Sequence, residues 1–494
     1  MMTTDTTDTS RRNLLKGGMA LAAAVPFVTT LQAFATRQAH AANPLPRMAG
    51  PYGRLKAVKD MTTGLELLQL PDGFNYKTFS WTGDLMIDGQ PVPGSHDGMG
   101  VVGVNKGRGG REIVLIRNHE VGSSSRGIPA PAIYDTVALD NGQQPGGGNT
   151  TIRFPVGIGK EVTTEPSLGG TLVNCAGGVT PWGTWLSCEE TTSDLTASGG
   201  RKHGYVFEVR QKADETTGQP IVQMGRFKHE AVCVDPDTSI VYQTEDQRNV
   251  AGYYRFIPDN TSKRAGALEE GGRLQAAKVK DVDGAMLLAP KLGDEYQLEW
   301  VDIADPDAAP QGSASGPYSQ ARAAGGLTMS RGEGIWYHQG KAYIVDTSAG
   351  RDGQGREGQG EGCVWMHDLK TDRISCIFAS NDSVIANNPD NITVSPRGGV
   401  LLCEDGGGVL DDYGFGERLI GLTRRGESYI FAKNNIVFND VEAASAGKNV
   451  PGSDYRNREF AGACFDPSGH FLFVNVQTPG ITFAIWGPWK RGSL

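Results

Sequence analysis

The sequence predicts an all-β protein, a six-bladed β-propeller with a metal cluster at one mouth of its central channel. Three observations carry this prediction. Glycine (68 residues) and proline (26 residues) are frequent among the 494 residues, and long helical periodicity is scarce. Short β-branched and aromatic runs alternate with turn residues, which is the pattern of antiparallel strands. A hairpin unit that ends in acidic residues recurs along the chain, as the internal repeats of a propeller do.

The repeated unit is an acidic or amide residue, a short apolar strand, a turn, and a second apolar strand that ends in acidic or amide residues. Four copies are well defined, at residues 230–245, 333–346, 391–404 and 461–475. Two looser copies precede them, at residues 96–120 and 169–189. We interpret residues 121–165 and 261–324 as insertions, and the glycine-rich residues 348–362 as a loop. Six such hairpins, separated by further strand pairs, indicate six blades.

The repeated acidic endings predict a cation site. In an antiparallel hairpin, the start of the first strand lies beside the end of the second. Glu230 is therefore expected near Glu245, and Glu333 near Asp346. If each hairpin is the inner half of a blade, all these ends meet at one mouth of the channel, where unpaired carboxylates repel one another. This ring predicts metal binding more strongly than any single motif does, and calcium suits its carboxylate and amide oxygens.

The stretch at residues 181–190 ends an apolar run in a thiol and two carboxylates. A thiolate is soft and prefers a transition metal, so we expect Cys188 to be a metal ligand; the alternative is a small buried apolar side chain. Cys403 also precedes two acids, but we expect it in the core, because adjacent side chains of a strand point to opposite faces. The candidate metal ligands are Cys188, Glu189, Glu230, Glu245, Glu333, Asn391, Glu404 and Glu120.

The start of the chain predicts export. Arg11 and Arg12 precede an apolar, alanine-rich stretch, and together they indicate a twin-arginine signal peptide over residues 1–41. We expect residues 42–494 to form a single propeller domain with loop insertions. It would work in the periplasm or as a secreted monomer, with the twin-arginine export machinery as a partner and no stable membrane anchor after cleavage. A formal net charge of −9 argues against nucleic acid as a partner.

Several motifs resemble the PhoX-type alkaline phosphatases. They are TPWGTWLSCEE at residues 180–190, GRFKHEAVCVDP at 225–236, SRGEG at 330–334, PDNITVSPRGGVLLCEDG at 389–406 and EFAGACFDPSGHFLFVNVQTPG at 459–480. The resemblance implies a six-bladed propeller that carries a ferric iron pair, calcium ions and a bridging oxo group. It also implies hydrolysis of phosphate monoesters, as small-molecule substrates, outside the cytoplasm.

The resemblance also implies roles for single residues. Cys188 is similar to the family's cysteine ligand to iron, and Glu333 to a metal-binding glutamate. Arg331 is similar to the arginine that holds the substrate phosphate, which makes it the candidate catalytic and substrate-binding residue. Metal ions would activate an oxide or hydroxide for in-line attack on phosphorus, while Arg331 and calcium neutralise the developing charge.

Two other functions stay open at this point. A calcium-dependent lactonase or esterase also uses a propeller with a central metal, but it has little need of Cys188 or iron. A non-catalytic exported propeller that binds proteins would explain the fold but not the buried carboxylates. Metal analysis separates the three hypotheses, because they require iron with calcium, calcium alone, or neither.

Overall fold

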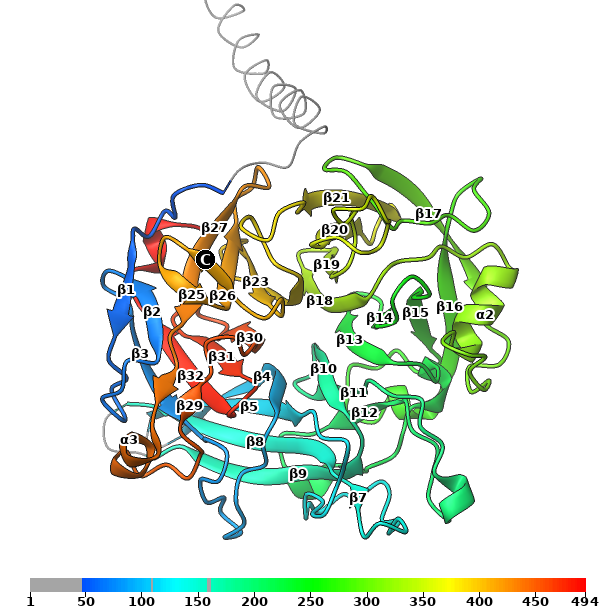
Figure 1. Cartoon of the computed structure of the whole chain (residues 1–494). Helices are drawn as coiled ribbons and strands as arrows, with labels where there is room; N and C mark the ends of the chain where they lie inside the picture. Colours follow the sequence, from blue (N-terminus) through cyan, green and yellow to red (C-terminus); the bar gives the residue numbers. More distant parts are fainter. Residues whose placement is uncertain (1–46, 108–109, 158–160) are drawn as a thin grey trace, which may run out of the picture.

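The computed structural model of the 494-residue chain describes residues 47–107, 110–157 and 161–494. Antiparallel sheets are arranged around a common centre (Figure 1), and helices are few and short. No helix among the described residues is long and apolar enough to cross a membrane. The predicted signal peptide lies outside the described residues.

Among the described residues, six innermost strands contact one another in a closed ring around the centre (Figure 1). They are β4 (His96–Gly107), β10 (Asn174–Val179), β13 (His229–Val234), β18 (Gly332–His338), β22 (Pro389–Val394) and β30 (Phe460–Phe465). Each belongs to a sheet that extends outward from the ring. The all-β class and the propeller-like arrangement that the sequence predicts are therefore confirmed.

Each innermost strand is the first strand of an antiparallel hairpin. The second strands are β5 (Gly110–His119), β11 (Trp185–Glu189), β14 (Val241–Glu245), β19 (Lys341–Asp346), β23 (Val400–Glu404) and β31 (Leu472–Val476). In the third hairpin His229 pairs with Glu245, and in the fifth Pro389 pairs with Glu404. The first strands therefore start, and the second strands end, at the same mouth of the ring.

Further strands extend these hairpins outward. They are β8 (Gly147–Val156), β9 (Thr163–Thr171), β12 (Val206–Val209), β15 (Tyr253–Pro258), β16 (Gly272–Val279), β20 (Cys363–Asp368), β21 (Arg373–Ala379), β26 (Arg418–Leu422), β27 (Ser428–Asn434) and β32 (Ile481–Trp486). Strand β17 (Glu295–Asp302) pairs with both β16 and β21 and so joins two sheets into one of nine strands.

Two segments that we interpreted as insertions carry part of this framework. Residues 121–165 contain β8, which is a central strand of the first sheet. Residues 261–324 contain β16, β17 and the helix α2 (Gly316–Ala323). In both segments, the mixed polar composition gives no clear strand pattern. The strands there pair with strands from other parts of the chain.

The N-terminal strands complete the C-terminal sheets. Strand β3 (Asn75–Phe79) pairs with β32, and β2 (Leu68–Pro71) pairs with β27. Strand β1 (Leu55–Val58) adds to the outer edge of β2. Figure 1 shows these blue strands beside orange and red ones. The ring is thus closed by ladder hydrogen bonds between the two ends of the chain, which leaves fewer open sheet edges.

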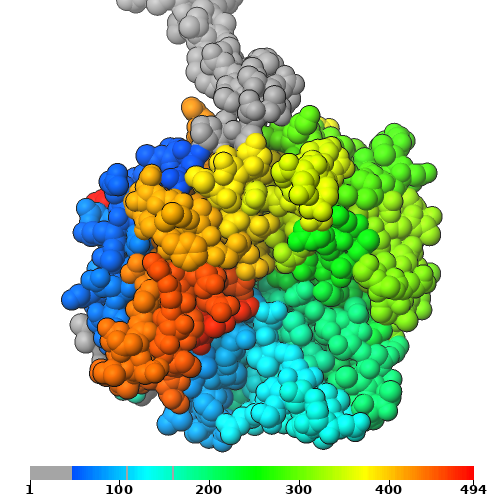
Figure 2. All heavy atoms as spheres, viewed as in Figure 1, coloured from blue at the N-terminus to red at the C-terminus, as the bar shows by residue number. Residues whose placement is uncertain are grey.

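Apolar side chains from both ends of the chain pack in the largest core cluster. It brings Tyr52, Phe74 and Trp81 against Phe431 and Trp489, all buried. Phe74 packs edge-on against Trp489 with ring centroids 4.7 Å apart. A space-filling view in the same orientation shows that side chains close much of the space between the ribbons (Figure 2). This packing holds the inner hairpins in place around the mouth.

Candidate metal centre

The same irregularity occurs at the start of all six innermost strands. The register shifts between His96 and Met99, Asn174 and Gly177, His229 and Val232, Gly332 and Ile335, Pro389 and Ile392, and Ala461 and Cys464. At each shift two residues of the first strand face one residue of the second, which is a β-bulge. A bulge bends its strand and re-aims a side chain that simple alternation would point elsewhere.

The first residue inside the bulge is an acid or a thiol in five of the six hairpins. These residues are Asp97, Cys175, Glu230, Glu333 and Asp390, and the sixth position is Gly462. Because the bulges share one register, the structure brings the five side chains towards one another at the mouth.

The second strands supply more carboxylates one residue beyond their ends. These residues are Glu120, Glu190, Asp246 and Asp405, and Glu459 lies just before β30. Asp246 is 8% exposed, whereas Asp405 is open to solvent. The mouth is therefore surrounded by acids from every side of the ring.

Three groups of these side chains could each hold a metal ion. In each group the ligand atoms all lie within 4.8 Å of one another. The groups are Cys175 with Glu190 and Glu230, Glu230 with Glu333 and Asp390, and Asp97 with Glu120 and Glu459. The first contains sulfur and suits a transition metal, and the other two offer only oxygen and suit a hard cation such as calcium.

Burial and mutual repulsion make these acids hard to ionise without cations. Burial, followed by the charges of Glu333 and Asp390, raises the pKa of Glu230 well above its usual range. Burial and the charge of Asp405 raise the pKa of Asp390 to about 7. Asp97, Glu120, Glu230, Asp390, Asp405 and Glu459 form no ion pair with a basic side chain in the described part of the chain. Cations would offset this repulsion, so the donor set fits bound metal ions.

Arg331 is the best-placed cation at the mouth. Its Nε and Nη2 atoms donate to the two carboxylate oxygens of Asp246 at 3.0 and 3.2 Å, and Nη2 also donates to Glu333 at 2.5 Å. The charge of Glu333, more than any other group, raises the pKa of Arg331. Arg331 has φ of 61°, a left-handed conformation that is costly for a residue with a side chain. It therefore reaches Glu333 from a strained turn before β18.

Cys188 belongs to none of the three donor groups and lies in a core cluster that also contains Cys175. It is fully buried among Leu186, Val206 and other apolar side chains. Burial raises the pKa of its thiol. This burial agrees with the alternative that the sequence left open, and the thiol that lies within one of the donor groups is Cys175.

Three other predicted ligands also lie outside the donor groups. They are Glu189, Glu245 and Glu404. Each is buried and satisfied by protein groups that do not belong to the cluster. Glu189 accepts hydrogen bonds from His203 and from the backbone of Leu172, Gly204 and Tyr205. Glu245 accepts from Tyr254 and the backbone of Gly252, and Glu404 accepts from Arg418 and the backbone of Asn387.

In each of these three hairpins the next residue reaches the mouth. Alternation along the strand points Glu189 and Glu190, for example, in opposite directions. The satisfied acid anchors the strand end in the blade, and its neighbour, Glu190, Asp246 or Asp405, faces the other acids. Glu120, Glu230 and Glu333 lie at the mouth as the sequence analysis expected.

Asn391 occupies the second residue of its bulge, beneath the acids. Its Oδ1 accepts a hydrogen bond from the backbone of Gly462 at 2.7 Å, and its Nδ2 donates to Asp390. The side chain therefore links two inner strands and orients one carboxylate of the cluster.

Sequence reasoning missed Asp97, Cys175, Glu190, Asp246, Asp390, Asp405 and Glu459. A signal for the bulge acids is present in the sequence. An acid or thiol followed directly by a small or amide residue opens five inner strands, as in Glu230–Ala231, Cys175–Ala176 and Glu333–Gly334. Only the bulge in the structure shows which residue of each pair points its side chain towards the mouth.

The floor of the site is built from the small residues that follow the bulge acids. Gly98, Ala176, Ala231, Gly334, Asn391 and Ala463 surround a cavity of about 20 Å³, roughly the size of one water. A Cβ atom on Gly98 would lie 2.4 Å from the Cα atom of Ala176. The inner strands approach this closely only because the residues are small.

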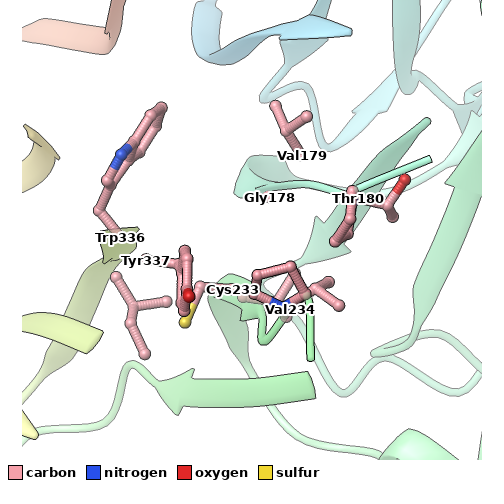
Figure 3. Close-up of a pocket in the computed structure, with 11 residues that line it drawn as sticks. Gly178, Val179, Thr180, Cys233, Val234, Trp336 and Tyr337 are labelled. Carbon is pink, nitrogen blue, oxygen red and sulfur yellow. The ribbon is translucent and has the colours of Figure 1, made fainter. Parts of the chain in front are cut away.

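An apolar pocket of about 310 Å³ lies at the opposite ends of β10, β13 and β18 (Figure 3). Val179, Thr180, Val234, Trp336 and Tyr337 line it. Its lining contains no carboxylate, in contrast to the acidic mouth.

Comparison with known proteins agrees with this geometry. The family model of alkaline phosphatase PhoX matches residues 51–154 and 143–480. The solved structure of Pseudomonas fluorescens PhoX in complex with vanadate, a transition-state analogue, superposes with a TM-score of 0.61 at 18% identity. That match covers 89% of this chain and 99% of the other, and it shows a shared fold.

Other structural matches are weaker. A putative gluconolactonase gives a TM-score of 0.37 at 12% identity, covering 88% of this chain and 98% of the other. A catalytically inactive virginiamycin B lyase from Staphylococcus aureus gives 0.34 at 10% identity, covering 84% and 99%. No curated protein matches the sequence. The family model covers most of the chain, and the protein therefore belongs to the alkaline phosphatase PhoX family, a family of enzymes.

Proposed function

We propose that this enzyme hydrolyses phosphate monoesters with metal ions held at the acidic mouth of a six-bladed propeller formed by residues 42–494. One observation carries the proposal. Three groups of mutually close ligand atoms lie beside a guanidinium that the protein holds in a fixed orientation. The six bulged inner hairpins support the blade count, since each would form the inner half of one blade.

The donor atoms favour two kinds of metal ion. Cys175 offers the thiolate that favours iron, together with Glu190 and Glu230. The all-oxygen groups favour calcium. When bound, such ions supply an activated oxygen nucleophile and positive charge for phosphoryl transfer. A ferric pair and a bridging oxo group stay predictions from the family resemblance.

Arg331 would hold the substrate phosphate beside the metal ions. Asp246 accepts hydrogen bonds from Nε and Nη2 of Arg331. The Nη1 atom of Arg331 has no hydrogen-bond partner among the described residues. A guanidinium fixed in this way can donate to phosphate oxygens without losing further side-chain entropy. Its positive charge would stabilise the charge that develops on those oxygens in the transition state.

Export is part of the proposal. The twin-arginine signal at residues 1–41 would send the protein to the periplasm or outside the cell, with no stable membrane anchor after cleavage. The substrates there would be small phosphate esters, and the enzyme would work as a monomer.

Metal analysis and phosphatase assays of protein purified from an export-competent host test the proposal. We expect iron and calcium in the protein and hydrolysis of phosphate monoesters that stops when both are removed. Full activity after complete metal removal contradicts the proposal. The lactonase and binding-protein hypotheses are not favoured, because the family model that matches the chain describes an alkaline phosphatase.

A further inference from the structure

Three basic side chains gather on one side of the acidic mouth, around Asp246. Arg331 forms the bidentate contact with Asp246. Arg248 follows Asp246 by two residues in the same loop. Lys228 is tied to this loop by its backbone, since the Asp246 amide donates to the Lys228 carbonyl oxygen at 3.0 Å. Together these three residues form what we call the basic rim.

Arg248 has no acidic partner. It is exposed, and its Nη1 atom makes only long contacts of 3.3 Å to the Gly358 carbonyl oxygen and 3.4 Å to Gln359. No carboxylate lies within ion-pair distance of it in the described ranges. Backbone contacts place it beside Arg331: the Arg331 amide lies 3.5 Å from the carbonyl oxygen of Gln247, and the Gly358 carbonyl oxygen also accepts from Ser330 Oγ at 3.1 Å. Arg248 therefore adds, beside the paired Arg331, a positive charge that no described carboxylate neutralises, and such a charge attracts an anion.

Lys228 lies on the other side of Asp246. Its Nζ atom is 3.7 Å from a Glu190 oxygen, and its side chain is 40% exposed. The contact is too long for a strong hydrogen bond. Nζ is therefore available to a further anion at the mouth.

The opposite side of the mouth differs in charge. Asp97, Glu120, Asp405 and Glu459 make no ion pair there with any basic residue that the structure describes. An anionic substrate would lie over the sector around Asp246, where basic side chains are present, while the acids hold cations.

Building on the proposed phosphatase function, we propose that Arg248 and Lys228 bind a second anionic group of the substrate. Within the basic rim, Arg331 would hold the phosphate that is cleaved, and Arg248 and Lys228 would hold a phosphate on the leaving alcohol. The preferred substrates would then be phosphate monoesters whose alcohol carries a second phosphate.

A matched pair of substrates tests this inference. Propane-1,3-diol bisphosphate and 3-hydroxypropyl phosphate differ only in the second phosphate. We expect the wild-type enzyme to show a higher kcat/KM for the bisphosphate. We also expect the ratio of the two kcat/KM values to fall about tenfold in Arg248→Gln, because one charge-assisted contact is lost. Arg248→Lys should keep part of the preference, and Lys228→Gln should lower it less.

The control is Arg373→Gln, on the outer strand β21. Arg373 pairs with Glu295 on the surface and is 55% exposed. This variant should keep both the ratio and the activity of the wild type. Raising the salt concentration should reduce the preference of the wild type, because salt screens exposed charges.

Two outcomes overturn the inference. One is a wild type without a preference for the bisphosphate, and the other is an Arg248→Gln variant whose ratio stays the same because it loses equally on both substrates. If the wild type hydrolyses neither compound, the proposed phosphatase function fails instead. Calorimetric binding of the bisphosphate then decides the inference, and equal affinities of wild type and Arg248→Gln overturn it.

Discussion

Arg331 and Asp246 form a bidentate ion pair between two inner hairpins, with Nε 3.0 Å from Oδ1 and Nη2 3.2 Å from Oδ2. Arg331 comes from the turn before β18, and Asp246 from the turn after β14. The pair leaves one nitrogen of the guanidinium open at the mouth, next to the acid groups. It therefore couples the position of the proposed phosphate-binding group to the candidate metal centre.

Arg331→Ala should reduce kcat for a phosphate monoester by about 100- to 1000-fold, the usual loss for one transition-state contact. Arg331→Lys should recover only part of this loss, because an ammonium group cannot donate in a fork. Metal content should stay near that of the wild type, since Arg331 is not a ligand. Normal hydrolysis by Arg331→Ala would mean that the substrate binds elsewhere.

Asp246→Asn should release the guanidinium of Arg331 without removing it. We expect a loss of about tenfold in kcat, smaller than for Arg331→Ala, because the loss of one charged hydrogen-bond partner costs about 1.5 kcal/mol or more. Inhibition by inorganic phosphate should weaken in parallel. If Asp246→Asn loses more activity than Arg331→Ala, Asp246 has a role beyond positioning Arg331.

Two cysteines provide a matched test of the transition-metal site. Cys175→Ala removes the only thiol of the three described donor groups, so we expect loss of the transition metal and of its visible absorption. Cys188→Ala should keep the metal and lower the free energy of unfolding by about 1 kcal/mol, because it removes only a small buried group. Elemental analysis and absorption spectra compare the two variants. Loss of iron from Cys188→Ala alone would restore the assignment made from sequence.

The position of the site could be predicted from sequence, but its ligands only in part. The recurring hairpins predict that strand ends meet at one mouth, and Glu120, Glu230 and Glu333 do lie there. In other hairpins the residue that lies at the mouth is the one after the predicted ligand, as with Glu190 in place of Glu189. The cause is local: alternation and the bulges decide which side chain turns inward, and a bulge has only a weak sequence signal.

The overall fold, like the site, could be predicted from the sequence only in part. Hairpins are local, so the inner pairs β13–β14 and β18–β19 follow directly from the repeat. Pairing of β3 with β32 joins residues about 400 positions apart, at Phe79 and Thr482, and no periodic pattern reveals it. Strands such as β8 and β17 were hidden for a similar reason, because tertiary neighbours and not their own composition stabilise them.

Removal of metal should destabilise the protein, and more at high pH than at low pH. The pKa of Asp390 is raised to about 7 by burial and by Asp405, above its value of about 4 in an unfolded chain. A carboxyl group with a raised folded-state pKa binds more protons when folded. Its stabilising effect is therefore full below about pH 4 and is lost as the pH rises through about 7.

Thermal unfolding at pH 5 and pH 8, with and without a chelator, measures this effect. The chelated protein should have the lower Tm at pH 8, where the acids repel one another. Added calcium should raise the Tm more at pH 8 than at pH 5, because protons compete with it at low pH. A chelated protein that is equally stable, or more stable, at pH 8 would show that the carboxylates are not mutually repelling in the fold.

Gly334→Ala should disturb the metal centre through the floor of the site. A Cβ atom on Gly334 would lie 2.8 Å from the Asp390 carbonyl oxygen, 2.9 Å from the Ile392 nitrogen and 3.0 Å from the Asn391 Cα atom. All three are backbone atoms, so β18 and β22 must move apart to accept the methyl group. Overpacking of this kind costs about 1–3 kcal/mol of unfolding free energy.

The movement should also weaken metal binding, because Glu333 and Asp390 belong to one donor group on these two strands. Urea unfolding of the metal-free protein and a calcium titration separate the two effects. Gly353→Ala is the control, since a Cβ atom there meets nothing within 4 Å. We expect the control to match the wild type in both measurements, while Gly334→Ala loses stability and binds calcium more weakly. If Gly334→Ala binds calcium normally, the spacing of the inner strands does not set the geometry of the site, and the bulged acids must adjust to the metal on their own.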